Sequence, residues 1–318
     1  MRSFFYSQFF VTPPLPTRDF TGKTVLVTGS NVGLGKEAAR HFTRLNASTV
    51  ILAVRSLEKG EAAKTDMENT SGRKGVLRVM QLDMSSYDSV LSFADTIGQT
   101  VDRLDVAVLN AGVNRGVWEV FEQDESTITV NVVSTFLLAF ALLPKLRETA
   151  RKFNTRPTLT VVSSEVHQWA KFEERKAPPG GIFARLNEKV AMTERYQVSK
   201  LLEVLFVRAW CGKAGVKELP VTVNLVNPGF CHSEFGREGG FVEAFARLLL
   251  ARKTEVGSRT LVHAASQGSE SHGAYLSDSS IVDPSVYVRS EEGAKDAERV
   301  WEELVGKLDG IRKDITKQ

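Results

Sequence analysis

Short apolar runs alternate with longer amphipathic stretches along most of this chain. The short runs are rich in valine, leucine and isoleucine, which is typical of strands buried on both faces of a parallel sheet. We expect about seven strands, at residues 23–28, 49–54, 76–82, 104–110, 159–163, 221–226 and around 274–276. The longer stretches carry apolar residues at helical spacing, and we expect helices at residues 34–45, 58–69, 86–100, 125–146, from about 196 to 212, and 297–308.

This alternation predicts an α/β fold of the Rossmann type, a doubly wound parallel sheet of about seven strands in a single domain. We expect an aromatic arm at residues 1–18, the sheet domain at 19–290 and a helical tail at 291–318. Two connections, at about 165–195 and 230–254, are long for simple loops and are expected to form lids over a binding site. Ligands of such sheets bind outside the carboxyl ends of the strands, so residues that follow a strand are the candidates for that site.

The N-terminal arm departs from this pattern. It gathers Phe4, Phe5, Tyr6, Phe9, Phe10 and Val11, and prolines follow at positions 13, 14 and 16. Its apolar part is short, is interrupted by polar residues and has no small-residue cleavage site, so it does not resemble a signal peptide. We expect the arm to pack its aromatic side chains on the domain; a peripheral contact with a membrane or a partner is the alternative.

Composition and charge narrow the class of partner. The 318 residues are 42% hydrophobic and 25% charged, and the net charge of +3 is spread over mixed signs, which gives no reason to expect a nucleic acid. Cys211 and Cys231 show neither metal spacing nor a disulfide framework, so we expect no metal and a reducing, cytoplasmic location, with membrane association through the arm as the alternative. No apolar run reaches the ~18 residues of a membrane span.

A glycine-rich turn, Thr28-Gly29-Ser30-Asn31-Val32-Gly33-Leu34-Gly35, follows the first expected strand and opens the first helix. Glycines there permit a tight turn and a close approach to a pyrophosphate, and a helix N-terminus offers free N–H groups. We therefore expect a dinucleotide at Gly29, Asn31, Val32, Gly33, Leu34 and Gly35. The glycines are spaced G-x-x-x-G-x-G rather than G-x-G-x-x-G.

Tyr196 and Lys200 form the second constellation. Their i, i+4 spacing places a phenol and an ammonium group on one face of a helix. A positive charge beside a phenol lowers a pKa that starts near ~10, which makes the hydroxyl a usable proton donor and acceptor near neutral pH.

Together these motifs resemble the classical short-chain dehydrogenase/reductase family over roughly residues 20–290. The motifs occur in the family's order, with Asn110-Ala111-Gly112, Asn131, Ser164 and Asn227-Pro228-Gly229 between and after the two above. The chain is most similar to the retinol-dehydrogenase-like branch and to related reductases of fungal secondary metabolism. The resemblance implies a catalytic tetrad of Asn131, Ser164, Tyr196 and Lys200.

The end of the second strand indicates the cofactor. An acidic residue there would bind the ribose 2′-hydroxyl of NAD, but the sequence is Ala53-Val54-Arg55-Ser56, and Arg55 can pair with a 2′-phosphate. We expect NADP(H). The resemblance adds to the cofactor site Asp83, Asn110, Ala111, Gly112, Tyr196, Lys200, Pro228, Gly229 and Ser233. Asp83 would hold the adenine or, as the alternative, cap the next helix, whereas Asn110 is expected mainly to tie neighbouring strands together.

The sequence thus predicts an NADPH-dependent oxidoreductase that interconverts a ketone or aldehyde and an alcohol. Apolar residues of the two long connections indicate a fairly large apolar substrate, although they could equally form the core of the lids: Phe172, Phe183, Leu186, Phe230, Phe235, Phe241 and Phe245. His167 is a weaker candidate for substrate contact. The alternatives are non-redox chemistry on the same fold (an epimerase, dehydratase or cyclase) and a nucleotide-binding protein without turnover. The family's frequent dimers and tetramers make a homo-oligomer an open expectation.

Overall fold

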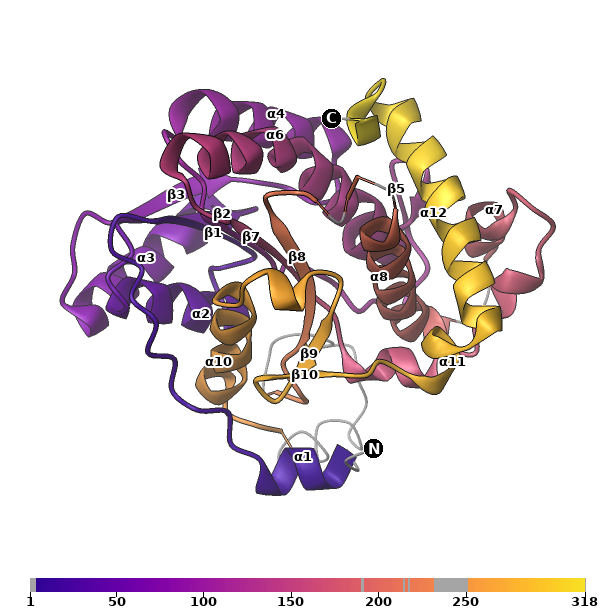
Figure 1. Cartoon of the computed structure of the whole chain (residues 1–318), viewed down its shortest axis with the longest axis horizontal. Coiled ribbons are helices and arrows are strands. Elements are labelled where there is room, and N and C mark those ends of the chain that lie inside the picture. The colour runs from indigo at the N-terminus through magenta and orange to yellow at the C-terminus, as the bar shows by residue number, and fades with distance from the viewer. Residues whose placement is uncertain (1–3, 190–191, 214, 217, 232–250, 318) are drawn as a thin grey trace.

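A single eight-stranded sheet forms the centre of the computed structural model, which describes residues 4–189, 192–213, 215–216, 218–231 and 251–317. The strand order is β10-β9-β8-β7-β4-β1-β2-β3 (Figure 1). All neighbours from β3 to β9 are parallel, and β10 runs antiparallel to β9. The strands are β1 (Thr24–Thr28), β2 (Thr49–Val54), β3 (Leu77–Gln81), β4 (Val106–Leu109), β7 (Thr158–Val162), β8 (Thr222–Asn227), β9 (Tyr275–Ser277) and β10 (Ser280–Val282).

The expected doubly wound α/β fold is confirmed, but the strand count is eight rather than seven. The missed strand, β10, is joined to β9 by Asp278 and Ser279, whose φ angles are 51° and 58°. All three residues of β10 are exposed, so it has no buried face and leaves no apolar run in the sequence. A small separate sheet pairs β5 (Val120–Phe121) with β6 (Asp124–Glu125).

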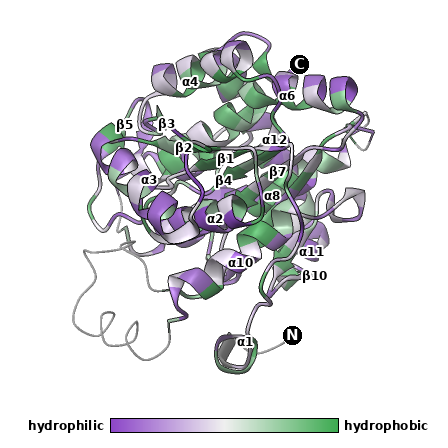
Figure 2. Ribbon diagram, turned by 90° about the vertical axis from the view of Figure 1, so that its left-hand side faces the viewer, coloured by the Kyte–Doolittle hydropathy of each residue, from purple (hydrophilic) through white to green (hydrophobic). Residues whose placement is uncertain are grey.

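Helices cover both faces of the sheet. One face carries α4 (Tyr87–Thr100), α6 (Thr135–Phe153) and α8 (Arg195–Gly212), with α12 (Glu291–Ile311) packed on α8; the other carries α2 (Gly33–Arg44), α3 (Leu57–Ser71) and α10 (Thr254–Ala265) (Figure 1). Each face of the sheet has its own apolar core. Along β1, the side chain of Leu26 packs in the core beneath α4, α6 and α8, whereas Val25 and Val27 pack in the core beneath α2, α3 and α10. Because both faces are covered, the central strands β1, β2 and β4 are buried and largely apolar, as the hydropathy colouring in Figure 2 shows. Shorter helices are α1 (Phe4–Phe10), α5 (Ser126–Ile128), α7 (Ile182–Leu186) and α11 (Val286–Arg289).

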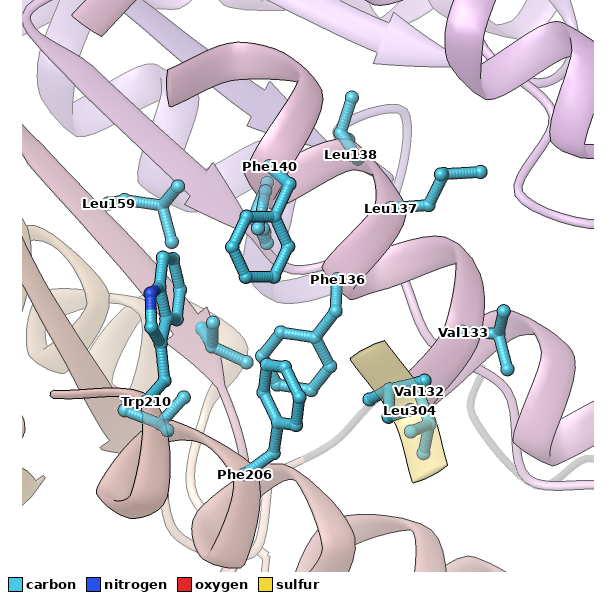
Figure 3. Packing of buried hydrophobic residues seen from close by; sticks show 14 of the residues in the cluster. Val132, Val133, Phe136, Leu137, Leu138, Phe140, Leu159, Phe206, Trp210 and Leu304 are labelled. Carbon is cyan, nitrogen blue, oxygen red and sulfur yellow. The ribbon is translucent and has the colours of Figure 1, made fainter. Parts of the chain in front are cut away.

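An aromatic cluster joins α6 to α8. The ring of Phe206 lies 4.2 Å from that of Phe136, and Phe140 lies 4.6 Å from Trp210, measured between ring centroids (Figure 3). Trp301 of α12 stacks on Phe206 at 5.0 Å. Aromatic pairs at these distances add to the free energy of area burial. The cluster therefore sets the position of the two helices that flank the candidate site.

The helix expected at residues 125–146 is longer and is interrupted. A π-helical turn, Thr129–Ser134, separates α5 from α6, and Thr135 Oγ1 donates to the carbonyl of Val130, 2.9 Å away. From Ser126 to Phe153 the helix is long and apolar enough to cross a membrane, contrary to the sequence expectation. Its apolar window is 94% buried inside the protein, which is typical of a core helix.

The N-terminal arm docks in the opposite sense to the one expected. Ser7 and Gln8 are buried, whereas Tyr6, Phe9 and Phe10 are 48%, 53% and 76% exposed. Gln8 Nε2 donates to the Phe230 carbonyl at 2.6 Å, and the Phe230 N–H donates back to Gln8 Oε1 at 3.2 Å. The expectation that the aromatic rings pack on the domain is wrong for Phe10, while Tyr6 and Phe9 are about half exposed; Ser7 and Gln8 supply hydrogen bonds from the arm to the domain. A membrane contact of the arm stays a prediction.

The direction of winding reverses at β1. The chain runs from β1 outward to β2 and β3 and then returns to β4, on the other side of β1. The carboxyl ends of β1 and β4 therefore lie at the point of the sheet where parallel α/β folds bind their ligands.

Candidate active site

The glycine-rich turn leaves β1 at Thr28 and enters α2 at Gly33. Gly29 and Gly33 have φ angles of 66° and 61°, which residues with a Cβ atom adopt at a cost. A Cβ on Gly35 would lie 2.5 Å from both the Gly29 carbonyl oxygen and Asn110 Nδ2, whereas a Cβ on Gly33 would meet nothing within 4 Å. The first two glycines bend the backbone, and Gly35 permits α2 to pack against the turn.

Asn110 and Thr28 join the ends of β4 and β1. Asn110 Nδ2 donates to the Thr28 carbonyl at 2.9 Å, and Thr28 Oγ1 accepts from the backbone N–H groups of Asn110 and Ala111, both at 2.9 Å. These bonds confirm the strand-tying role expected for Asn110. Ala111 and Gly112 continue from there, partly buried, beside the turn.

The start of α2 suits an anion. Val32 occupies the N-cap position in extended conformation, with φ −146°, and no side chain caps the first turn. Asn31 and Leu34 on either side are partly buried, and Val32 is 40% exposed. Uncapped N–H groups at a helix N-terminus attract a phosphate. With the open space beside Gly33, this turn fits the pyrophosphate of a dinucleotide.

The end of β2 presents a positive charge. Arg55 follows the last strand residue, Val54, and its side chain is exposed. Among the described residues no hydrogen bond or ion pair engages its guanidinium group. The next residue, Ser56, caps α3 by accepting from the Lys59 N–H at 3.3 Å. The arrangement leaves the Arg55 guanidinium available to an anionic group at this edge.

Asp83 lies beyond β3, where its Oδ1 accepts from the Ser85 N–H at 2.9 Å and from the Ser85 hydroxyl at 2.7 Å. The N-cap of α4 is Ser86, which accepts from the Ser89 N–H. The expectation that Asp83 itself caps the helix is therefore wrong in its detail, because Asp83 stabilises the preceding turn.

Asn131 lies in the π-helical turn and is fully buried. Its Oδ1 accepts from the Val113 N–H at 2.8 Å, and its Nδ2 donates to the Val113 carbonyl at 2.9 Å and to Ser199 Oγ at 3.0 Å. Ser199 Oγ in turn donates to the Tyr196 carbonyl at 2.7 Å. Asn131 is thus connected through Ser199 to the helix that carries Tyr196. π-helical turns occur frequently at functional sites.

Ser164 follows β7, and its hydroxyl is close enough to Tyr196 to lower the pKa of that phenol. His167 does not share this position. Its Nδ1 lies 2.7 Å from the Ser164 carbonyl and its Nε2 accepts from the Ser285 N–H at 3.1 Å. Both ring nitrogens are therefore engaged, and the ring is only 1% exposed, which makes substrate contact by His167 untenable in this geometry.

Tyr196 and Lys200 share one face of α8, with Lys200 Nζ 5.7 Å from the centroid of the Tyr196 ring. Lys200 is buried, and its Nζ donates to the Val162 carbonyl at 2.9 Å and to Glu203 Oε1 at 2.7 Å. Burial, and then the negative charge of Glu203, raise the pKa of Tyr196 above its usual value. The sequence expectation of a lowered pKa is wrong for this structure, because burial of the phenol disfavours its ionised form and the negative charge of Glu203 adds to that effect.

The turn after β8 carries the last expected motif. Asn227 Oδ1 accepts from the Glu165 and Gly229 N–H groups, both at 3.1 Å, and Asn227 Nδ2 donates to Ser277 Oγ at 3.1 Å. Asn227 therefore fixes Pro228 and Gly229 against the turn that follows Ser164. Gly229 has a φ of 79°. Ser233 lies outside the described residues.

The apolar residues expected from the first long connection are buried in the core of the protein. Phe172, Phe183 and Leu186 are 1%, 5% and 0% exposed and belong to the main apolar core, so for them the lid-core alternative is confirmed. Phe230 is partly buried. Phe235, Phe241 and Phe245 lie outside the described residues.

The sequence analysis did not predict the roles of three residues at this edge. These are Ser199, Glu203, and Asn227 in its link between neighbouring strands. Ser199 stands inside the Tyr196–Lys200 interval, and Glu203 continues the same helix face at i+3 from Lys200. Spacing could have pointed to both. No local signal shows that a carboxylate there would be buried.

Comparisons with known proteins identify the family. Residues 23–154 match the short chain dehydrogenase family. The chain is 51% identical over 319 residues to the short chain dehydrogenase/reductase dmxR8 of Cryptosporiopsis sp., covering 98% of both proteins. The chain therefore belongs to the short-chain dehydrogenase/reductase family; its placement in the retinol-dehydrogenase-like branch stays a prediction.

Solved structures share the fold at low sequence identity. The Pseudomonas aeruginosa RhlG/NADP active-site complex matches with a TM-score of 0.61 at 21% identity, covering 81% of this chain and 95% of that one. The 3-ketoacyl-(acyl-carrier-protein) reductase from Brucella melitensis complexed with NADH matches with a TM-score of 0.60 at 18% identity, covering 81% and 97%.

Proposed function

We propose that this protein is an NADPH-dependent reductase of a ketone or aldehyde carried on an apolar small molecule. The convergence of Ser164, Tyr196 and Lys200, at the same carboxyl edge of the sheet from which the glycine-rich turn leaves β1, carries this proposal. Asn131 belongs to the same assembly through Ser199. A hydroxyl, a phenol and a buried ammonium at the carboxyl edge of the sheet are the groups that proton transfer to a carbonyl oxygen requires.

The glycine-rich turn and the uncapped start of α2 would hold the pyrophosphate, and Arg55 would pair with the 2′-phosphate of NADP. Asp83, Pro228 and Gly229 would bound the rest of the cofactor. When bound, the cofactor supplies a hydride. The two solved neighbours, one holding NADP and the other NADH, do not choose between the cofactors, so the choice depends on Arg55.

Ser164 would donate a hydrogen bond to the substrate oxygen, an interaction that in comparable sites lowers the barrier by about 3 kcal/mol. Tyr196 would give its proton to the same oxygen as negative charge develops there. The raised pKa of Tyr196 keeps the phenol protonated, which suits a proton donor. Lys200 would stabilise the phenolate that results, and Asn131 would connect the site to a proton source.

The activity is tested with purified protein, NADPH and a panel of apolar ketones and aldehydes. We expect carbonyl-dependent loss of NADPH absorbance, and a kcat/KM with NADPH at least about tenfold above that with NADH. Equal values for the two cofactors would refute the NADP preference. Conversion of panel members by isomerisation or dehydration without net NADPH consumption would replace the reductase with the non-redox alternative.

A further inference from the structure

Glu203 is a buried carboxylate in the candidate site with no role in the reaction described above. Its side chain is 2% exposed, and its Oε1 accepts from Lys200 Nζ at 2.7 Å. Its second oxygen, Oε2, is buried and makes no hydrogen bond of normal geometry among the described residues, although the Ser163 hydroxyl lies close enough to the carboxylate to lower its pKa. A half-satisfied buried carboxylate is costly, so its retention beside Lys200 calls for a functional reason.

The helix geometry places three ionisable groups in one row. Tyr196, Lys200 and Glu203 stand at i, i+4 and i+7 of α8, on a single face. Lys200 Nζ is held between Glu203 Oε1 and the Val162 carbonyl, and the Ser163 hydroxyl donates to the Lys200 carbonyl at 3.2 Å. The lysine is thus fixed in place by a carboxylate that also cancels its charge.

In the part of the chain that the structure describes, the other elements around this row contribute hydroxyls, carboxylates and one arginine that is already ion-paired. Ser163 and Ser164 contribute hydroxyls from the end of β7, and Tyr275 of β9 contributes a buried phenol. Glu165, Asp278 and Arg252 lie in the next layer, where Asp278 and Arg252 are ion-paired at 2.8 Å. Lys200 and Glu203 are therefore the pair whose balance of charge acts on Tyr196.

We propose that Glu203 is a positioning residue that holds Lys200 and offsets its charge, so that Tyr196 stays protonated over a wider pH range and the site favours carbonyl reduction over alcohol oxidation. The inference rests on the proposed function. In reduction the O–H bond of Tyr196 breaks and its proton joins the substrate oxygen, while the hydride comes from NADPH. Oxidation needs the phenolate first, to accept the proton of the alcohol, and an uncompensated ammonium would favour that form.

The burial of Glu203 supports this balance. Burial raises the pKa of Glu203 to about 7, and Lys200 and the Ser163 hydroxyl limit that rise. Glu203 is then ionised above neutral pH, where phenolate would otherwise begin to form. The negative charge of Glu203 is therefore present at the pH values above neutral at which a Tyr196 phenolate would most favour alcohol oxidation.

The test compares wild type with Glu203→Gln, which keeps the shape and removes the charge. We expect the acid limb of the pH profile for alcohol oxidation to move down by at least about one pH unit, with oxidation at neutral pH rising about tenfold. A second readout needs no turnover: ultraviolet absorbance of tyrosinate, in protein alone, with Tyr196→Phe versions subtracted to isolate this phenol. It should ionise at lower pH in Glu203→Gln than in wild type.

A matched control is Glu148→Gln. Glu148 pairs with Lys145 at 2.8 Å, also at i+3, on α6 outside the tetrad, and its loss should move neither readout. Glu203→Asp keeps the charge but withdraws it from Lys200, so it should shift both readouts in the same direction and less; it decides the question if Glu203→Gln does not fold.

The outcomes separate the two proposals. Wild type that reduces no carbonyl compound contradicts the proposed function, and the tyrosinate titration still decides on Glu203. Wild type that reduces carbonyls, with profiles and titrations of Glu203→Gln that coincide with wild type, overturns the inference alone. An equal loss of kcat at every pH, with an unmoved titration, would show that Glu203 is merely structural.

Discussion

Two regions at the carboxyl edge of the sheet, the glycine-rich turn and the centre around Tyr196, depend on different interactions. The turn between β1 and α2 is a continuous stretch of eight residues, from Thr28 to Gly35, whose shape depends on φ angles and on the lack of side chains. The centre around Tyr196 is assembled from β7, the π-helical turn and α8, and depends on buried polar groups that pair with one another. The turn should therefore be sensitive to added volume, and the centre to changes in charge and hydrogen bonding.

The largest effect on activity should come from a substitution in the centre around Tyr196. Tyr196→Phe removes the proton donor without changing volume, so kcat should fall at least about a hundredfold while NADPH still binds. Steady-state kinetics and a fluorescence titration of NADPH measure the two effects. Tyr87→Phe is the control, because its hydroxyl donates to Asp124 at 3.2 Å outside the tetrad; near-wild-type turnover in Tyr196→Phe would discard the assignment.

One added methyl group in the glycine-rich turn should lower both the stability of the protein and its affinity for NADPH. Gly35→Ala places a Cβ 2.5 Å from the Gly29 carbonyl oxygen, so the turn must shift, and we expect a loss of about 1–3 kcal/mol in unfolding free energy with at least tenfold weaker NADPH binding. Denaturant unfolding and fluorescence titration check both. Gly98→Ala in α4 has open space and should be neutral or stabilising; equal behaviour of the two variants would contradict the packing argument.

In the cofactor-binding half, the charge expected to affect affinity is that of Arg55, at the exposed end of β2. Arg55→Asp replaces the exposed guanidinium with a carboxylate, so NADPH affinity should fall at least about tenfold while NADH affinity rises. Arg78→Asp makes the same charge change on an exposed position of β3 and should leave both affinities unchanged. An unaltered affinity for NADPH in Arg55→Asp would count against a 2′-phosphate contact.

The smallest effect concerns pH. Burial lowers the pKa of His167, so at pH values just below 6.5 the unfolded chain binds a proton at His167 more readily than the folded protein does. The stability that neutral His167 contributes is present above its unfolded pKa of about 6.5 and is lost as pH falls further. His167→Gln should be less stable than wild type at neutral pH, with a shallower decline of Tm below that point. Parallel declines for the two proteins would show that His167 does not titrate in this way.

Sequence pattern predicted the first half of the edge better than the second. The expected strand at 49–54 matches β2, and the glycine turn lies where its spacing indicated, because φ preferences and apolar runs are local properties. Two of the three ionisable groups in the row on α8 were recognised. Tyr196 and Lys200 stood out, whereas Glu203 read as an ordinary polar residue of a helix.

Helix spacing, the bend of the glycine turn and the doubly wound order of elements were properties of the sequence alone. Tertiary structure decided which way the pKa of Tyr196 moves, which face of the arm is buried, and that β10 completes the sheet. These outcomes depend on what lies next to a group in space: the burial that raises the pKa of Tyr196 comes from elements brought together by the fold, and burial of the Glu203 carboxylate cannot be seen from its spacing on α8. A pattern of neighbours in sequence does not contain that information.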